Sequence, residues 1–211
     1  MNASSASSDY STLRAAALVV IVASVLMSCG NNTSLLENAS LLQGQNVIVR
    51  ELPADSDDKG EFTYFRLSDS SIVTGRDIAT PRWDIAFRST TIWINGGTNR
   101  PGRGGAQVLR NQDYNALVEA PSTGYQVDES STTLAIPSGS GNGWYTYNAL
   151  AATITPIANT VIALRTGEGK YAKLQILSYY RGAPTTPTIT STPRYYTFRY
   201  FYQPNGSRTL Q

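Results

Sequence analysis

WDIAFRSTTIWINGGTNRPGRGGAQVLR, residues 83–110, is the stretch that indicates the fold class most clearly. In its first part, Trp83, Ile85 and Phe87 fall on one face of an extended chain, because successive side chains of a strand alternate between its two faces. A second alternating run covers residues 92–95. Two runs with a period of two, rich in β-branched and aromatic residues, predict two adjacent strands.

The second half of this stretch is a glycine-rich loop that carries two arginines. Five glycines between Gly96 and Gly105 exclude regular structure, and Arg100 and Arg103 lie among them. One interpretation is a hairpin with a long loop. The other is a loop whose backbone approaches a ligand while the arginines contact an anionic group. A phosphate loop of the Walker type is excluded, since no Gly-Lys-Ser/Thr follows.

Outside this stretch, the same alternation predicts further strands. They cover residues 47–52, 61–67, 106–110, 153–156, 160–165, 170–180 and 194–203, with a tight turn at 166–169. In the last of them Tyr196, Phe198, Tyr200 and Tyr202 share one face, which is typical of a core. Residues 111–119 are the best candidate for a helix. We therefore predict one antiparallel all-β domain, sandwich-like, with very little helix.

The composition agrees with a packed domain and excludes some functions. Of the 211 residues, 41% are hydrophobic and 10% aromatic, so the chain can bury a core. A formal net charge of +2 is too small to indicate nucleic-acid binding, which needs a clustered basic surface. The aspartates Asp55, Asp57 and Asp58 lack the glycine and the distal glutamate of a calcium loop, and we expect a solvated turn there.

The N-terminal segment has the features of an export signal. Residues 15–27 are apolar except Ser24, follow Arg14, and are too few to span a bilayer comfortably. The run ends in Leu26-Met27-Ser28-Cys29, which resembles the bacterial lipoprotein signal. An ordinary cleaved signal that happens to contain a cysteine is the alternative. Lipidation explains the single cysteine better, because a lone cysteine in an exported chain has no disulfide partner.

From this we expect three regions. Residues 1–28 are a lipoprotein signal peptide, residues 29–45 are a tether acylated at Cys29, for example with palmitate, and residues 46–211 are the β domain. The predicted location is the outer membrane of the cell envelope, on its periplasmic or its surface face. Gly30 and Asn31 provide no acidic export tag, so the sequence leaves the face open.

The side chains that are missing exclude most catalytic sites. Histidine is absent, Cys29 is the only cysteine, and Met1 and Met27 are the only methionines. A histidine-based triad, a cysteine nucleophile in the domain and a histidine-rich zinc site are thereby excluded. A catalytic pair of carboxylates, as in glycosidases, is not excluded; the candidates are Asp84, Asp113, Asp128 and Glu129. However, Arg82 and Arg88 flank Asp84 and predict a structural ion pair, and we expect no enzyme.

Several motifs, in order along the chain, resemble the HmuY-like family. They are residues 83–88 and 95–97 with 104–106, then Ala120-Pro121 before Gly124-Tyr125, Gly143-Trp144-Tyr145, residues 165–173 and residues 196–200. The similarity extends from about Val47 to Ser207. The resemblance implies an envelope lipoprotein of Bacteroidetes-type bacteria with an all-β fold. The best known member of that family binds haem and delivers it to an outer-membrane receptor.

The resemblance also implies where haem iron would be held. That member uses two histidines, which would fall here near Ala149 and within residues 130–142, yet neither place has one. Related haemophores use methionine, which the mature chain lacks. Tyrosinate is the remaining ligand type, and Tyr145 and Tyr147 are the nearest candidates. The alternative is that both tyrosines only pack or face solvent.

Two functions follow from these observations. The first is haem or porphyrin binding for haem acquisition without the histidine ligands of the family, with Arg100 and Arg103 meeting the propionates. The second is a lipoprotein that binds a non-haem ligand, or an unknown partner, on the same fold. The expected partners are the membrane, through the lipid anchor, and haem or an outer-membrane receptor.

Overall fold

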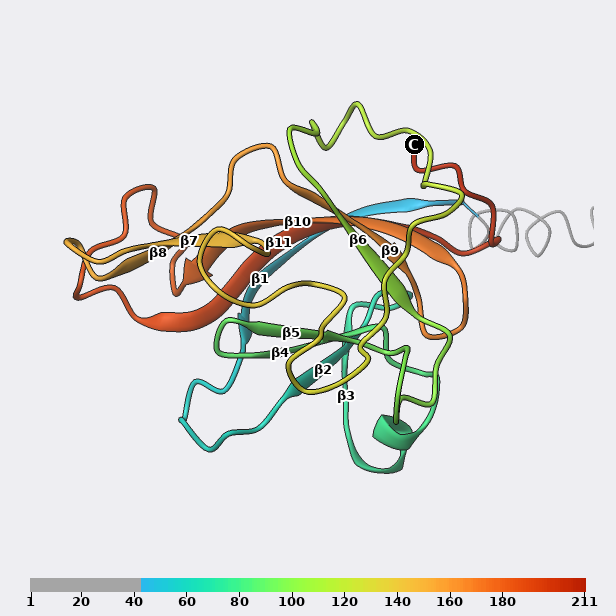
Figure 1. The fold of residues 1–211 in the computed structure, drawn as a ribbon, viewed down its shortest axis with the longest axis horizontal. Helices are drawn as coiled ribbons and strands as arrows, with labels where there is room; N and C mark the ends of the chain where they lie inside the picture. Colours follow the sequence, from blue (N-terminus) through green and yellow to red (C-terminus); the bar gives the residue numbers. More distant parts are fainter. Residues whose placement is uncertain (1–42) are drawn as a thin grey trace, which may run out of the picture.

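The computed structural model describes residues 43–211, and this part of the chain is almost entirely β structure (Figure 1). The predicted signal peptide, Cys29 and most of the tether lie outside the described residues. The strands are β1 (Gln45–Pro53), β2 (Thr63–Arg66), β3 (Ser71–Val73), β4 (Ile85–Arg88), β5 (Thr91–Ile94), β6 (Gly105–Leu109), β7 (Tyr145–Asn148), β8 (Thr153–Pro156), β9 (Val161–Arg165), β10 (Tyr171–Tyr180) and β11 (Pro193–Gln203). A short 3-10 helix, η1 (Gly75–Ala79), precedes β4.

Two antiparallel sheets form the body of the domain. The larger has the strand order β1-β11-β10-β9-β6, and the smaller has the order β3-β2-β4-β5. In Figure 1 the long strands β10 and β11 run across the molecule, and the smaller sheet lies below them. The hairpin β7–β8 forms a separate two-stranded sheet at one end. The prediction of an antiparallel, sandwich-like all-β domain is confirmed.

The space between the two sheets is filled by aromatic side chains of β11. Tyr196, Phe198, Tyr200 and Tyr202 are buried, as their shared face predicted. The Phe198 ring lies 5.4 Å from that of Phe87 on β4 and 5.6 Å from that of Phe65 on β2. The buried phenols are satisfied too, since Tyr196 and Tyr200 donate 2.8 Å hydrogen bonds to the carbonyls of Ser89 and Leu67. One strand thus holds both sheets together.

The predicted position of Trp83 is wrong. It does not share a face with Ile85 and Phe87, but packs in a second cluster with Val73 and Ala86. The reason is that β4 begins only at Ile85, so Trp83 lies outside the regular alternation of the strand. Its indole Nε1 donates a 2.9 Å hydrogen bond to the carbonyl of Ile78 in η1.

The predicted helix at 111–119 is also wrong, because the segment forms turns. Asp113 Oδ1 accepts hydrogen bonds from the backbone N–H groups of Asn115 and Ala116, which favours a turn. Lys173 Nζ donates to the carbonyls of Tyr114 and Leu117 at 2.9 and 2.8 Å. Carbonyls that a helix would use for its own hydrogen bonds are thus directed at a buried side chain of β10.

Among the described residues, no helix has the length and apolar character that crossing a bilayer requires.

Replacing Phe198 by alanine tests the sheet interface. We expect Phe198→Ala to lower the free energy of unfolding by about 3–5 kcal/mol, because it removes a fully buried ring between two sheets. Urea unfolding followed by circular dichroism measures the change. Ile72→Ala is the control, since Ile72 on β3 is 50% exposed and should cost no more than about 0.5 kcal/mol. Equal losses in the two variants would contradict this description of the core.

Candidate functional site

The first candidate site lies where the β7–β8 hairpin meets the end of β10, at the left of Figure 1. The backbone N–H of Ile154 donates a 2.8 Å hydrogen bond to the phenol oxygen of Tyr180, which fastens β8 to β10. Beside this contact is a hollow of about 240 Å³. Ile154, Leu177, Pro184 and Pro187 contribute apolar walls, so β8, β10 and the segment that joins β10 to β11 all take part.

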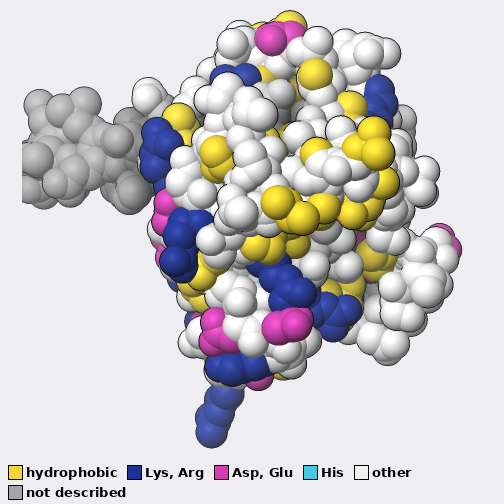
Figure 2. Space-filling view, turned by 90° about the vertical axis from the view of Figure 1, so that its left-hand side faces the viewer, with side chains coloured by type: hydrophobic (Ala, Val, Ile, Leu, Met, Phe, Trp, Pro, Cys, Tyr) yellow, Lys and Arg dark blue, Asp and Glu magenta, His cyan; other side chains and the backbone are white. Residues whose placement is uncertain are grey.

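Exposed apolar side chains extend this hollow over the end of the domain. Tyr147 is directly opposite Ile154 in the hairpin, so the two share a face. Tyr147 is 50% exposed and Leu177 43%, and Leu150 and Ile189 are more exposed still. Figure 2, which views this end, shows hydrophobic side chains grouped across the middle of the face, with Lys and Arg side chains below them. We call Tyr147, Leu150, Ile154, Leu177 and Ile189 the apolar end; such patches often mark ligand sites.

The two candidate tyrosines have different environments. Tyr145 is buried, and its ring lies 4.9 Å from that of Trp144 within the main core. Its phenol oxygen is 3.5 Å from Thr90 Oγ1. Tyr147, two residues later, lies beyond the edge of the core with its ring in solvent. Tyr145 therefore has a packing role, and Tyr147 is the tyrosine that a ligand can reach.

The segments in which the resemblance places the two histidines of the best known family member, residues 130–142 and the vicinity of Ala149, lie on either side of β7. Ser140 Oγ accepts a 2.8 Å hydrogen bond from the backbone N–H of Tyr147, and Gly141 N–H donates to the carbonyl of Tyr145 at 2.8 Å. Residues 149–152 form the turn of the β7–β8 hairpin. The fold thus places both segments next to the apolar end.

This end does not provide the usual ligands of haem iron. The chain has no histidine, and its methionines and its cysteine lie before the described residues. Among residues 43–211 there is also no group of three or more acidic or sulfur side chains that could hold a metal ion. Iron held by two histidines does not fit this surface, because the chain contains no histidine. Tyr147 Oη is the oxygen available for a weaker contact with iron.

The side chain of Arg100 packs inside the domain and holds the glycine loop in place. Its guanidinium lies 3.8 Å from the ring centroid of Trp93 and 3.7 Å from the buried carboxylate of Asp128. Asp128 also accepts hydrogen bonds from the backbone N–H groups of Ile94 and Ala135. Arg100 and Asp128 thereby fasten the loop to β5 and to the 128–135 segment, which leaves Arg100 little freedom to bind a ligand.

Arg103 is exposed but lies far from the tyrosines. It donates a 2.8 Å hydrogen bond to the carbonyl of Glu168, in the turn between β9 and β10. In Figure 1 this turn is at the right of the molecule and the β7–β8 hairpin is at the left. The structure therefore does not bring Arg103 together with Tyr145 and Tyr147, which lie on the hairpin.

The expected ion pair of Asp84 is not formed. Asp84 is buried and accepts hydrogen bonds from the backbone N–H groups of Leu67 and Gly167, at 2.8 and 3.0 Å. Arg82 pairs instead with Asp77, and the Arg88 guanidinium lies over the ring of Phe62. Backbone donors already satisfy the carboxylate, so it needs no arginine. Burial, opposed by the two hydrogen bonds, raises the pKa of Asp84 to about 6.

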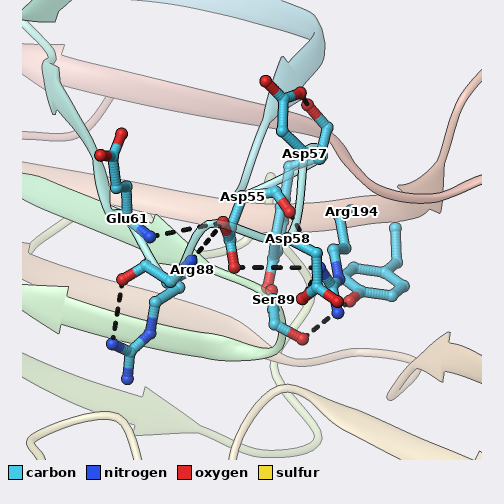
Figure 3. Close-up of polar contacts among 11 residues, drawn as sticks. Asp55, Asp57, Asp58, Glu61, Arg88, Ser89 and Arg194 are labelled. Atoms are coloured by element: carbon cyan, nitrogen blue, oxygen red, sulfur yellow. Dashed lines mark hydrogen bonds and ion pairs between the residues drawn. The ribbon is translucent and has the colours of Figure 1, made fainter.

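The aspartate turn near residue 55 is an organised structural feature (Figure 3). Asp55 Oδ1 accepts hydrogen bonds from the backbone N–H groups of Gly60 and Glu61. Arg194 at the start of β11 pairs with Asp58 at 2.5 Å and with Asp55 at 3.8 Å. The turn is thereby attached to β11, which explains Asp55 and Asp58 without a bound cation.

Sequence reasoning missed Leu177, Ile189 and Arg181. Leu177 follows Lys173 and Gln175 at alternate positions of β10, and an apolar residue after two polar ones was the available signal. Arg181 directly follows Tyr180; its guanidinium lies 4.1 Å from the ring centroid of Tyr195 and donates to the phenol oxygen. Ile189 lies in an irregular segment where periodicity gives no signal.

Comparisons with known proteins identify the family and the fold. The family described as HmuY protein matches residues 58–200. No curated protein matches the chain. An apo HmuY analogue from Tannerella forsythia is similar in structure, with a TM-score of 0.50 and 14% identity, over 76% of this chain and 97% of that one. At this identity the similarity shows a shared fold.

Two further solved structures are similar at a lower score. One is a candidate HmuY-like heme-binding protein from Bacteroides vulgatus ATCC 8482, with a TM-score of 0.49 and 15% identity, over 77% of this chain and 93% of that one. The other is a candidate lipoprotein from Bacteroides fragilis NCTC 9343, with a TM-score of 0.49 and 19% identity, over 77% of this chain and 92% of that one.

The raised pKa of Asp84 predicts a pH-dependent stability. Its ordinary pKa is 3.8 and its folded value about 6, so between these values the folded state binds more protons than the unfolded state. The free energy of unfolding should therefore fall as the pH rises from about 4 to about 6, by up to about 3 kcal/mol from this group, and then level off. Urea unfolding at several pH values, for wild type and Asp84→Asn, measures the difference. Parallel pH profiles of the two proteins would contradict the assignment.

Proposed function

The chain belongs to the HmuY family, and on this basis we propose that it is a lipid-anchored envelope protein that binds a tetrapyrrole, haem or iron-free porphyrin, at its apolar end. Binding occurs without a histidine ligand. The lipid anchor is Cys29, which ends a lipoprotein-type signal. The family match covers the β domain, so the proposal for the anchor rests on the N-terminal sequence and the proposal for the ligand rests on the domain.

The observation that carries the proposal is the row of exposed apolar side chains beside the hollow at the end of β10. Tyr147 pairs with Ile154 across the hairpin, and Ile154, which is partly buried, lines the hollow together with Leu177. A porphyrin is a flat apolar ring with carboxylates along one edge. Each Å² of apolar surface that it covers contributes about 25 cal/mol.

A cation near the apolar end can pair with the carboxylate edge of such a ligand. Arg181 follows Tyr180, which lines the hollow, and its guanidinium is held on the ring of Tyr195. An arginine fixed in this way presents its remaining N–H donors as a rigid fork, which suits a carboxylate. This role replaces the one that we assigned from the sequence to Arg100 and Arg103.

Because the chain has no histidine, we expect the affinity to come from contacts with the porphyrin ring. Iron adds to the affinity only through Tyr147. Haem and iron-free porphyrin should therefore bind about equally. The buried carboxylates Asp84 and Asp128 serve the fold, in agreement with a binding protein rather than an enzyme.

The size of the hollow supports a second candidate function. Its volume of about 240 Å³ lies below the range of about 300–1,000 Å³ that is usual for enclosed small-molecule sites. A smaller apolar group, or a side chain of a protein partner, would fill it. In that case the protein is an interaction lipoprotein on the HmuY fold, and the apolar end is its contact surface.

Titration of the purified protein with haemin and with protoporphyrin IX tests the first function. We expect saturable binding of both, with dissociation constants within about threefold of each other, because no strong iron ligand exists. Absorption and tryptophan-fluorescence changes measure the binding. If neither compound binds saturably, the first function is wrong and the second is favoured.

Two substitutions locate the site. Leu177→Asp places a charge in the apolar end and should weaken both ligands by about tenfold or more, because a carboxylate must be desolvated under the ring. Ile72→Asp is the matched control: Ile72 on β3 is 50% exposed but belongs to the smaller sheet, so binding should be unchanged. Tyr147→Phe tests whether the phenol oxygen binds iron or the ring only packs against the ligand. It should weaken haemin alone if the phenol binds iron, and neither ligand if it only packs.

A further inference from the structure

The glycine loop contains a second hollow, at the end of the domain opposite the apolar end. It has a volume of about 480 Å³ and is lined by Gly97, Arg103, Gly104, Val127, Arg165 and Gly169. Arg165 ends β9 and is paired with Gly105 at the start of β6. The loop and the β9–β10 turn are therefore brought together by the sheet itself, although they are more than 60 residues apart in the sequence.

The glycines of this hollow are explained by close packing of the backbone. A Cβ at Gly97 would lie 2.2 Å from the carbonyl oxygen of Asp128, and one at Gly104 would lie 2.5 Å from that of Asn95. Gly97 also has a φ of +107°, which disfavours other residues. These glycines thus serve the packing of the loop, and the two arginines are the charged groups of the hollow.

Both arginines are oriented by backbone carbonyls. Arg165 Nε donates a 2.8 Å hydrogen bond to the carbonyl of Arg103, and Arg103 Nη2 donates to the carbonyl of Glu168. Each bond uses one donor of a guanidinium group and leaves its other donors available. The arrangement fixes the two side chains at the hollow before any ligand arrives.

Neither arginine has a carboxylate partner within the described residues, where ion pairs involve other side chains. Asp128, the buried acid beside the loop, is already bound to Arg100 and to two backbone N–H groups. The side chain of Glu168 lines a different, smaller hollow together with Arg66 and Arg82. Two positive charges thus lie at one concave surface without a counter-ion, and their mutual repulsion favours the arrival of an anion.

We propose that this hollow is an anion-binding site, in which Arg103 and Arg165 hold a phosphate or carboxylate group of a small ligand. Planar guanidinium groups give such groups two parallel hydrogen bonds, which makes arginine well suited to bind them. The volume of the hollow leaves room for the part of the ligand that carries the anion. The site is independent of tetrapyrrole binding, because it lies at the other end of the domain.

Titration of the purified protein at low ionic strength with inorganic phosphate and with succinate tests the proposal. We expect saturable heat of binding for at least one of them, weakened about tenfold or more by Arg103→Gln and by Arg165→Gln. Arg50→Gln is the control, since it removes an exposed positive charge from β1. Circular dichroism checks that each variant is folded. If Arg165→Gln is not, Arg103→Gln decides the test, because the Arg103 side chain is exposed and hydrogen-bonds to the carbonyl of Glu168 in an exposed turn.

Two results would overturn the proposal: no saturable binding of either anion, or an equal loss in Arg50→Gln. A second experiment, on lipid vesicles, identifies the source of the anion. Vesicles of phosphatidylcholine with and without phosphatidic acid are compared, with inorganic phosphate as competitor. Extra binding that depends on phosphatidic acid and is displaced by phosphate indicates a lipid headgroup. Binding of the free anion without any such effect indicates a soluble ligand.

Discussion

The structure depends on the packing of one aromatic row between two sheets. Tyr196, Phe198, Tyr200 and Tyr202 of β11 are buried, and the rings of the first three pack on Phe65 of β2 or Phe87 of β4. The phenols of Tyr196 and Tyr200 have carbonyl or hydroxyl partners at the ends of the smaller sheet. β11 is also hydrogen-bonded to β1 and β10 on its two sides. Because this one strand fixes both the larger sheet and its position on the smaller one, all other elements are placed relative to it.

The two candidate sites are consequences of how the long strands end. At one end, β10 extends beyond the sandwich core and supports the β7–β8 hairpin through Tyr180, which leaves apolar side chains of both elements in solvent. At the other end, the β9–β10 turn meets the glycine loop and orients two arginines. One end is thus suited to binding an apolar ligand or partner, and the other to binding an anion. The domain therefore has two chemically distinct contact regions.

The sequence was informative where side-chain alternation is strict, and less so where long-range contacts decide. The hairpin of β9 and β10 and the buried row of β11 followed directly from a period of two. The helix expected at 111–119 failed because Lys173, which is distant in sequence, binds the carbonyls of that segment.

The candidate site was only partly predictable for the same reason. The sequence predicts one site that contains both the tyrosines and the arginines, yet Tyr147 lies on the β7–β8 hairpin and Arg103 lies at the β9–β10 turn on the other side of the domain. Sheet pairing, such as that between Gly105 and Arg165, decides this separation and leaves no local trace in the sequence. The measurement that tests the central claim most directly is the broadening of backbone amide NMR signals by the paramagnetic iron of bound haemin. The account predicts broadening confined to the hairpin, the end of β10 and residues 181–192. Broadening centred on the glycine loop and the β9–β10 turn would contradict it.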